Sequence, residues 1–226
     1  MFMFIVKEGY PFIIASLVVA AIVYFLFGAY WAVIPVVLAV YFAYFFRDFH
    51  RSMPYDPNIL YSPADGTVMG VEEIFDDEYL NEPALKLTIF LSVFNVHTNR
   101  SPLDGEIKYQ RYTCGQFVPA YEKSASFENE RHAVGIDNGR IRFLVIQVAG
   151  LLARRIVSWV TVGHQLKQGE TYGMIKFGSS TELIVPRNVE ICVQKGQTVV
   201  GGVTVVGRIK AWIIVVLFPI ALAPVV

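Results

Sequence analysis

The chain has 226 residues, with 19 Lys and Arg balanced by 19 Asp and Glu, so its formal net charge is zero. This balance argues against a nucleic-acid partner, because nucleic-acid-binding proteins normally carry a basic excess. Hydrophobic residues make up 54% of the chain, which is high for a water-soluble domain, and the excess lies at the two ends. The four histidines are not in a common metal-binding spacing, so no metal site is expected.

Two apolar runs without any charge open the chain, at 11–27 and 30–46. Each approaches the ~17–25 residues that a helix needs to cross a bilayer. Lys7 precedes the pair and Arg47 follows it, so the positive-inside rule places both flanks and the following domain on the cytoplasmic side of the cell membrane. A shallow hairpin inserted into one leaflet is an alternative. A signal peptide is disfavoured, because no small-residue cleavage site closes the first run and the second run would be unexplained.

After residue 51 the composition becomes that of a globular domain, with short β-type runs separated by turn residues. Three prolines, Pro54, Pro57 and Pro63, predict an extended entry rather than a helix. Asn138-Gly139 lies between two apolar segments and is a strong hairpin signal. Strands are expected at 85–93, 141–148, 155–161, 182–185 and 203–209, and a helix is expected at 116–130.

The expected fold is mainly β (α+β). An N-terminal transmembrane helical hairpin at 1–51 precedes a barrel-sandwich-like β domain at 52–210. The apolar tail at 211–226 is short for a span, so it either makes a third membrane contact or packs on the anchor.

The pattern Ser-Pro-x-Asp-Gly occurs twice, at 62–66 and 101–105. Two unrelated Asp-Gly turns would explain it, since such turns are common. The match at four of five positions also suggests a repeated β-unit.

The segment Lys176-Phe177-Gly178-Ser179-Ser180 lies between two β-type runs and has companions in a fixed order. They are the segments 61–68, 90–102, 123–126, 128–131, 153–157 and 169–179. With these motifs, the chain from about 47 to 207 resembles the phosphatidylserine decarboxylase proenzymes. The resemblance is to their short bacterial and archaeal branch, which includes archaetidylserine decarboxylase-like proteins.

The resemblance implies self-cleavage between Gly178 and Ser179. The Ser179 hydroxyl would attack the Gly178 carbonyl, and elimination and hydrolysis would leave a covalent pyruvoyl cofactor in place of the serine. The products would be a β-subunit of residues 1–178 and an α-subunit that begins at the former Ser179. The pyruvoyl group would then act as the electron sink for decarboxylation, the role that pyridoxal phosphate has elsewhere.

A serine hydroxyl is a poor nucleophile without a positioned base. The family uses an Asp-His-Ser arrangement, in which Asp65 matches the aspartate. Longer members carry two histidines three residues apart; here the first is His97 and the second position is Arg100. We expect His97 to serve both self-cleavage and decarboxylation, while His132 or His164 could replace the missing base.

The resemblance also implies a membrane phospholipid substrate and a homodimer of processed protomers. Lys123, Arg131, Arg154 and Arg155 are candidates for binding the substrate's phosphate or carboxylate, because a cationic side chain suits those groups. Each of the four could instead be ordinary surface charge. A non-catalytic β-domain of the lipoyl or phosphocarrier type is an alternative, but this chain has neither the lysine at a hairpin tip that a lipoyl carrier needs nor the paired histidines of a phosphocarrier. A serine hydrolase would need a Gly-x-Ser-x-Gly elbow, which the sequence also lacks.

Overall fold

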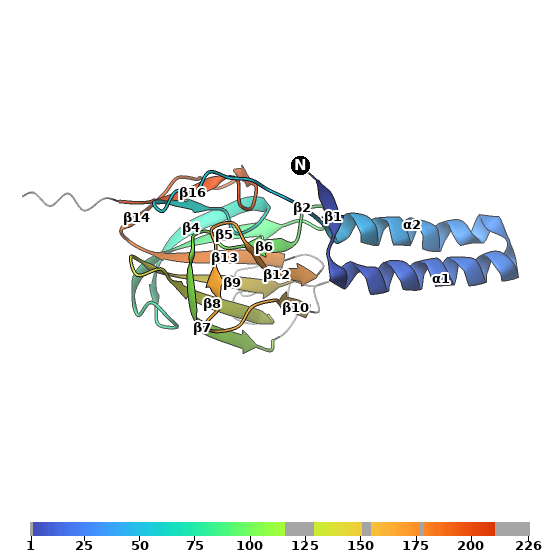
Figure 1. The fold of residues 1–226 in the computed structure, drawn as a ribbon, viewed down its shortest axis with the longest axis horizontal. Helices are drawn as coiled ribbons and strands as arrows, with labels where there is room; N and C mark the ends of the chain where they lie inside the picture. The colour runs from blue at the N-terminus through green and yellow to red at the C-terminus, as the bar shows by residue number, and fades with distance from the viewer. Residues whose placement is uncertain (1, 116–128, 151–154, 177–178, 211–226) are drawn as a thin grey trace, which may run out of the picture.

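The computed structural model describes residues 2–115, 129–150, 155–176 and 179–210, which form a β domain with two helices projecting from one end (Figure 1). The prediction of a mainly β chain is confirmed, and the main sheet curls into a half-barrel. The expected helix at 116–130 lies mostly outside the described residues, and the expected tail at 211–226 lies wholly outside them.

The two helices, α1 (Tyr10–Phe27) and α2 (Ala29–Phe45), follow a 3-10 turn, η1 (Lys7–Gly9), and lie side by side (Figure 1). Gly28 alone separates them and has a φ of +86°, a left-handed conformation that favours glycine. Small residues are buried along the middle of the pair, namely Ser16, Ala20, Ala32, Pro35 and Ala39. Their size lets the two backbones approach closely.

The outer surface of the helix pair is apolar. The segment from Lys7 to Phe27 has 21 residues and a mean hydropathy of 2.4, so by length and composition it could cross a membrane; α2 is also apolar but shorter. Large side chains point outward from both helices, with Phe25 83% and Ile34 66% exposed. Soluble proteins rarely leave so large an apolar patch open to water, so this surface is suited to lipid.

The base of the helix pair is fixed to the β domain. Strand β1 (Met3–Ile5) precedes the helices and pairs with β2 (Arg47–Phe49), which follows them. Val6, Phe45, Phe46 and Met174 form a buried cluster at this junction. The helix pair and the β domain therefore share a packed interface, which lies at the end of the domain where the candidate site is found.

The main sheet is built from eight strands: β4 (Gly66–Asp76), β5 (Glu82–Leu91), β7 (Gly105–Thr113), β8 (Arg131–Asp137), β9 (Arg142–Ala149), β11 (Gln165–Leu166), β13 (Ser179–Pro186) and β15 (Thr198–Val199). They are antiparallel, in the order β11-β7-β8-β9-β13-β5-β4-β15. Successive side chains of a strand point to opposite faces. Leu87, Val145 and Leu183 thus enter the main core, while Leu144 and Ile184 enter a smaller cluster on the other face.

Two three-stranded sheets complete the domain. One contains β6 (Thr98–Arg100), β10 (Arg155–Ser158) and β12 (Thr171–Lys176) in the order β10-β12-β6; the other contains β3 (Ile59–Tyr61), β14 (Val189–Ile191) and β16 (Val205–Ile209) in the order β14-β16-β3. All five predicted strands are present, with β10 shorter and β13 longer than expected. The predicted turn joins β8 to β9. Strands β4, β7, β8 and β12 were not predicted.

The two Ser-Pro-x-Asp-Gly segments have the same local structure. The hydroxyls of Ser62 and Ser101 each donate to the carbonyl two residues later, at 2.7 Å and 2.5 Å, and a strand begins at the glycine of each segment. The segments are also hydrogen-bonded reciprocally, from the Tyr61 N–H to the Pro102 carbonyl and from the Arg100 N–H to the Pro63 carbonyl. The repeated unit is therefore confirmed, and it places Asp65 and Asp104 at equivalent positions.

Candidate active site

Ser179 is the first residue of β13 and lies between β5 and β9, opposite Leu91 and Ala149. The alternation of β13 directs its side chain to the same face as Leu183, whereas Ser180 points to the other face. Ser179 is completely buried, and its Oγ has no hydrogen-bond partner among the described residues. Buried hydroxyls are normally bonded, so one without a partner among the described residues fits a nucleophile.

A polar row lies next to Ser179 on the inner face of the sheet. Asn99 donates to the Thr181 hydroxyl at 2.8 Å and accepts from the Gln147 amide at 2.8 Å, and Gln147 Oε1 lies 3.1 Å from His132 Nδ1. Asn99 also lies 3.4 Å from the Pro63 carbonyl. This network joins the segments of Asp65, His97 and Ser179, and sequence reasoning did not single it out although Asn99 lies within a recognised motif.

His97 lies in the turn between β5 and β6, where its carbonyl accepts from the Ile175 N–H at 3.1 Å. Its ring is fully buried and packs on Phe45, with centroids 4.2 Å apart. Neither ring nitrogen makes a hydrogen bond of normal geometry among the described residues.

Burial lowers the pKa of His97 to about 4; the nearby Asn95 carbonyl and the charge of Asp65 oppose this shift, and the charge of Arg47 adds to it. The imidazole is therefore neutral at physiological pH and can accept a proton.

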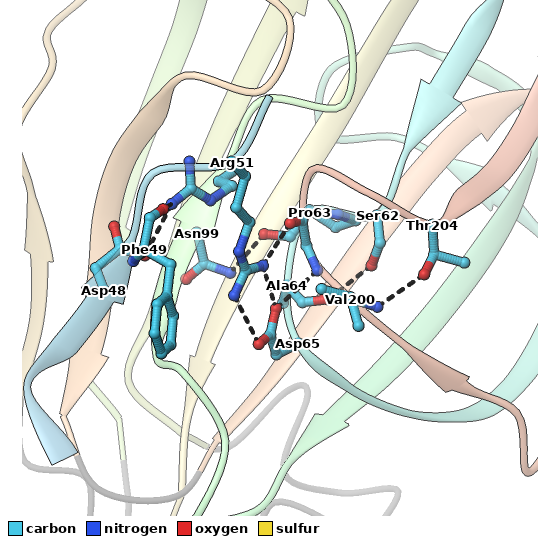
Figure 2. Close-up of polar contacts among 12 residues, drawn as sticks. Asp48, Phe49, Arg51, Ser62, Pro63, Ala64, Asp65, Asn99, Val200 and Thr204 are labelled. Atoms are coloured by element: carbon cyan, nitrogen blue, oxygen red, sulfur yellow. Dashed lines mark hydrogen bonds and ion pairs between the residues drawn. The ribbon is translucent and has the colours of Figure 1, made fainter. Parts of the chain in front are cut away.

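Asp65 is held by an arginine rather than by a histidine (Figure 2). Arg51 Nη1 lies 2.5 Å from Asp65 Oδ1, and Arg51 Nη2 lies 2.9 Å from Oδ2. The Gly201 N–H donates to Oδ1 at 2.7 Å. The predicted contact between Asp65 and an imidazole is thus not formed in this structure, although the Asp65 charge makes a small contribution that opposes the lowering of the His97 pKa.

The other candidate bases lie in different surroundings. His132 is buried, and its Nδ1 faces Gln147; burial lowers the pKa of His132. His164 is substantially exposed and lies 3.5 Å from a Glu170 oxygen. His97 differs from both in being fully buried with neither ring nitrogen in a hydrogen bond of normal geometry to a described residue.

Arg100 makes a structural ion pair. Its side chain is buried, with Nη2 2.8 Å from Asp48 Oδ1 and 2.9 Å from the Phe49 carbonyl, and Nη1 3.2 Å from the Gly169 carbonyl. Burial lowers the pKa of Arg100 and the charge of Asp48 opposes the shift. The residue that stands where longer family members have a histidine therefore ties the β domain to the segment leaving the helices.

We predict that Arg100→Ala destabilises the protein by about 3–5 kcal/mol, because it leaves the buried Asp48 charge unpaired. Urea unfolding of the purified protein measures this. The exposed pair of Arg187 and Glu73 supplies the matched control: Arg187→Ala should change the unfolding free energy by less than about 1 kcal/mol. Equal effects of the two variants would contradict a structural role for the Arg100 ion pair.

The predicted phosphate-binding residues are scattered. Arg131 pairs with Glu78 at 2.5 Å, while Lys123 and Arg154 lie outside the described residues. Arg155 is exposed and lies opposite Lys176 in the β10–β12 ladder. Lys176 comes two residues before Gly178 in the sequence. Burial lowers the pKa of Lys176, and the Arg155 charge contributes to this. Of the four candidates, Arg155 is the one whose partner on the neighbouring strand belongs to the cleavage motif.

An open cavity of about 800 Å³ in the described part of the chain is lined by residues such as Arg140, Arg142 and Asn188, and it includes none of the predicted site residues. Within the same described ranges, no three His, Cys, Asp or Glu side chains cluster in a way that could hold a metal ion.

Comparison with known proteins agrees with the motifs. A family profile described as phosphatidylserine decarboxylase matches residues 38–207. Proteins named phosphatidylserine decarboxylase proenzyme are 45% identical in Carboxydothermus hydrogenoformans, over 90% of this chain and 96% of the relative, and 44% identical in Symbiobacterium thermophilum, over 91% and 95%. A third, from Syntrophus aciditrophicus, is 41% identical over 90% and 97%. The chain belongs to the phosphatidylserine decarboxylase family.

Proposed function

We propose that this protein is a self-processing decarboxylase that converts phosphatidylserine to phosphatidylethanolamine and CO₂. The observation that carries the proposal is Ser179, which directly follows Gly178 at the start of a central strand and whose buried hydroxyl has no hydrogen-bond partner among the described residues. The proenzyme names of relatives covering about 90% of the chain support the same conclusion.

Self-cleavage begins when Ser179 Oγ attacks the carbonyl carbon of Gly178 and its proton passes to His97. The C–N bond then breaks as the nitrogen is protonated, leaving an ester between Gly178 and Ser179. Removal of the α-proton expels the Gly178 carboxylate and leaves dehydroalanine. Water then replaces the nitrogen, which leaves as ammonia, and residue 179 becomes a pyruvoyl group.

His97 suits this reaction because its imidazole is neutral and buried. A base with a lowered pKa accepts the proton only in passing and returns it readily to the leaving nitrogen. The negative charge of Asp65 stabilises the imidazolium in between, as the aspartate does in hydrolytic triads. Asp65 and His97 thus act together even though no hydrogen bond joins them in this structure.

The pyruvoyl group, once formed, supplies the electron sink that makes loss of CO₂ from an amino acid possible. The chain's own residues bind and protonate around it. We assign reprotonation of the substrate α-carbon to His97, and contact with the lipid phosphate to Arg155. Arg155 and Lys176 lie opposite each other on neighbouring strands, and paired cations at this spacing suit an anionic headgroup.

The helix pair anchors the protein in the cell membrane, with the β domain on its cytoplasmic side. The apolar outer surface of α1 and α2 supports insertion, and the basic residues at both flanks support the orientation. A lipid substrate stays in the bilayer because its chains are costly to hydrate. Residues 1–51 are the anchor and 52–210 the catalytic domain, and processed protomers assemble as a homodimer.

The proposed activity is tested with purified protein and vesicles that contain a lipid labelled at the serine carboxylate. Release of labelled CO₂ from diacyl phosphatidylserine is expected, and its complete absence from processed, folded protein would refute the assignment. Vesicles of diether archaetidylserine, assayed in parallel, determine whether the enzyme prefers the archaeal lipid.

A further inference from the structure

Arg51 lies in the segment that leaves the helix pair, and its side chain is only 3% exposed. Its guanidinium makes a two-point contact with both Asp65 oxygens and also donates to the Gly201 carbonyl (Figure 2). Two-point contacts between a guanidinium and a carboxylate fix the carboxylate plane as well as neutralising its charge. A single arginine therefore determines how Asp65 is oriented.

The contacts leave a defined part of the carboxylate available. An ionised carboxylate has about four acceptor positions, two on each oxygen. Oδ1 accepts from Arg51 and from Gly201, and Oδ2 accepts from Arg51 alone among the described residues. Within this part of the chain, Oδ2 consequently keeps one acceptor position for a further N–H donor.

The repeated unit provides an internal comparison. Asp104 occupies the equivalent position of the second Ser-Pro-x-Asp-Gly turn, yet its only side-chain hydrogen bond among the described residues is from the Tyr55 hydroxyl at 3.4 Å. The second turn has the same hydrogen bonds as the first without an arginine on its aspartate. The turn therefore does not need Arg51 in order to form, and the arginine is an addition specific to Asp65.

Arg51 is itself fixed to the anchor. Three residues earlier, Asp48 pairs with Arg100 at 2.8 Å, and β2 pairs with β1 at the base of the helices. The segment from β2 to Arg51 is thus tied to the β domain by two buried ion pairs. Each pair joins one residue of this segment to one residue of a catalytic motif.

We propose that Arg51 is a positioning residue for the reaction: it orients Asp65 so that Oδ2 faces the imidazole, which makes the exit from the membrane anchor part of the catalytic site. This rests on the proposed self-cleavage function. It implies that the anchor contributes to catalysis directly, in addition to holding the enzyme at the bilayer.

The test compares the self-cleavage rates of full-length variants by denaturing electrophoresis of freshly synthesised protein. Arg51→Ala should slow cleavage by about 10–100-fold, by analogy with the range found for residues that orient metal ligands. Arg51→Lys should restore only part of the rate, because an ammonium cannot make the two-point contact. Millimolar guanidinium should accelerate Arg51→Ala by occupying the vacated space, and it should not accelerate Asp65→Asn.

Two controls separate positioning from folding. Arg187→Ala removes an exposed arginine, and Asp104→Asn alters the equivalent turn; both should cleave at the wild-type rate. Wild-type cleavage by Arg51→Ala, or slow cleavage by folded Arg51→Ala without rescue by guanidinium, would overturn the proposal for Arg51. If Arg51→Ala does not fold, wild-type cleavage by Arg51→Lys would overturn it equally. Cleavage by Ser179→Ala would instead refute the proposed function itself.

Discussion

Replacement of Ser179 by alanine is expected to abolish self-cleavage and to reduce decarboxylation to the background rate. The variant loses the hydroxyl that attacks Gly178, and with it the only source of the pyruvoyl group, so both reactions fail for one reason. Catalysis by enzymes of this kind accounts for many orders of magnitude in rate, and none of it remains without the electron sink. Intact mass of the purified protein and CO₂ release from lipid vesicles measure the two effects.

Ser180→Ala is the matched control for this experiment. Ser180 is the next residue of β13 and is also buried, but the alternation of the strand points its side chain to the opposite face. We expect Ser180→Ala to cleave normally. If Ser180→Ala lost cleavage and Ser179→Ala retained it, the nucleophile would be Ser180, and the assignment to Ser179 would be wrong.

Replacement of His97 by alanine is expected to slow self-cleavage by about 10²–10⁴-fold, the usual contribution of a general base. The same substitution in His132 tests the alternative base, and His164→Ala serves as a surface control. Conversion of precursor to two chains, followed over time, gives the three rates. A normal rate for His97→Ala with a slow rate for His132→Ala would move the base to His132.

The pH dependence of cleavage tests His97 in a second way. A base acts only when it is unprotonated, and burial lowers the pKa of His97 to about 4. The rate attributable to His97 should therefore be constant from neutral pH down to about pH 5 and fall as the pH drops through about 4. Arg47→Gln should move this fall to higher pH, because the Arg47 charge lowers the pKa of His97. A fall centred near 6.5 in the wild type would contradict a buried, neutral base.

Much of the β domain could be predicted from local sequence patterns. The strands at β5, β9 and β13 are rich in β-branched and other apolar residues, and the Asn138-Gly139 turn is a local signal. Strand β4 was missed because its outer half carries charged and exposed residues such as Glu72 and Glu73, which obscure the alternation. The curling of the sheet depends on pairings between distant segments, which no local pattern encodes.

The site shows the same division. Ser179, His97 and Asp65 could be singled out because their motifs resemble those of a known family. The contacts of Asp65 could not be predicted, because they join distant parts of the chain. Arg51 lies 14 residues before Asp65, and Gly201, which packs against the Ala64 backbone, lies 136 residues after it. The bond from Asn99 to Thr181 joins residues 82 positions apart, so only the folded chain reveals it.

The central claim, that Ser179 becomes a pyruvoyl group by self-cleavage, is tested most directly by intact-mass measurement of active wild-type protein. The account predicts two chains, one of residues 1–178 and one of 48 residues that begins at position 179. The shorter chain should be one ammonia lighter than the same fragment with an N-terminal serine. A single chain of 226 residues in a fully active preparation, or a short chain that retains its serine, would contradict the account.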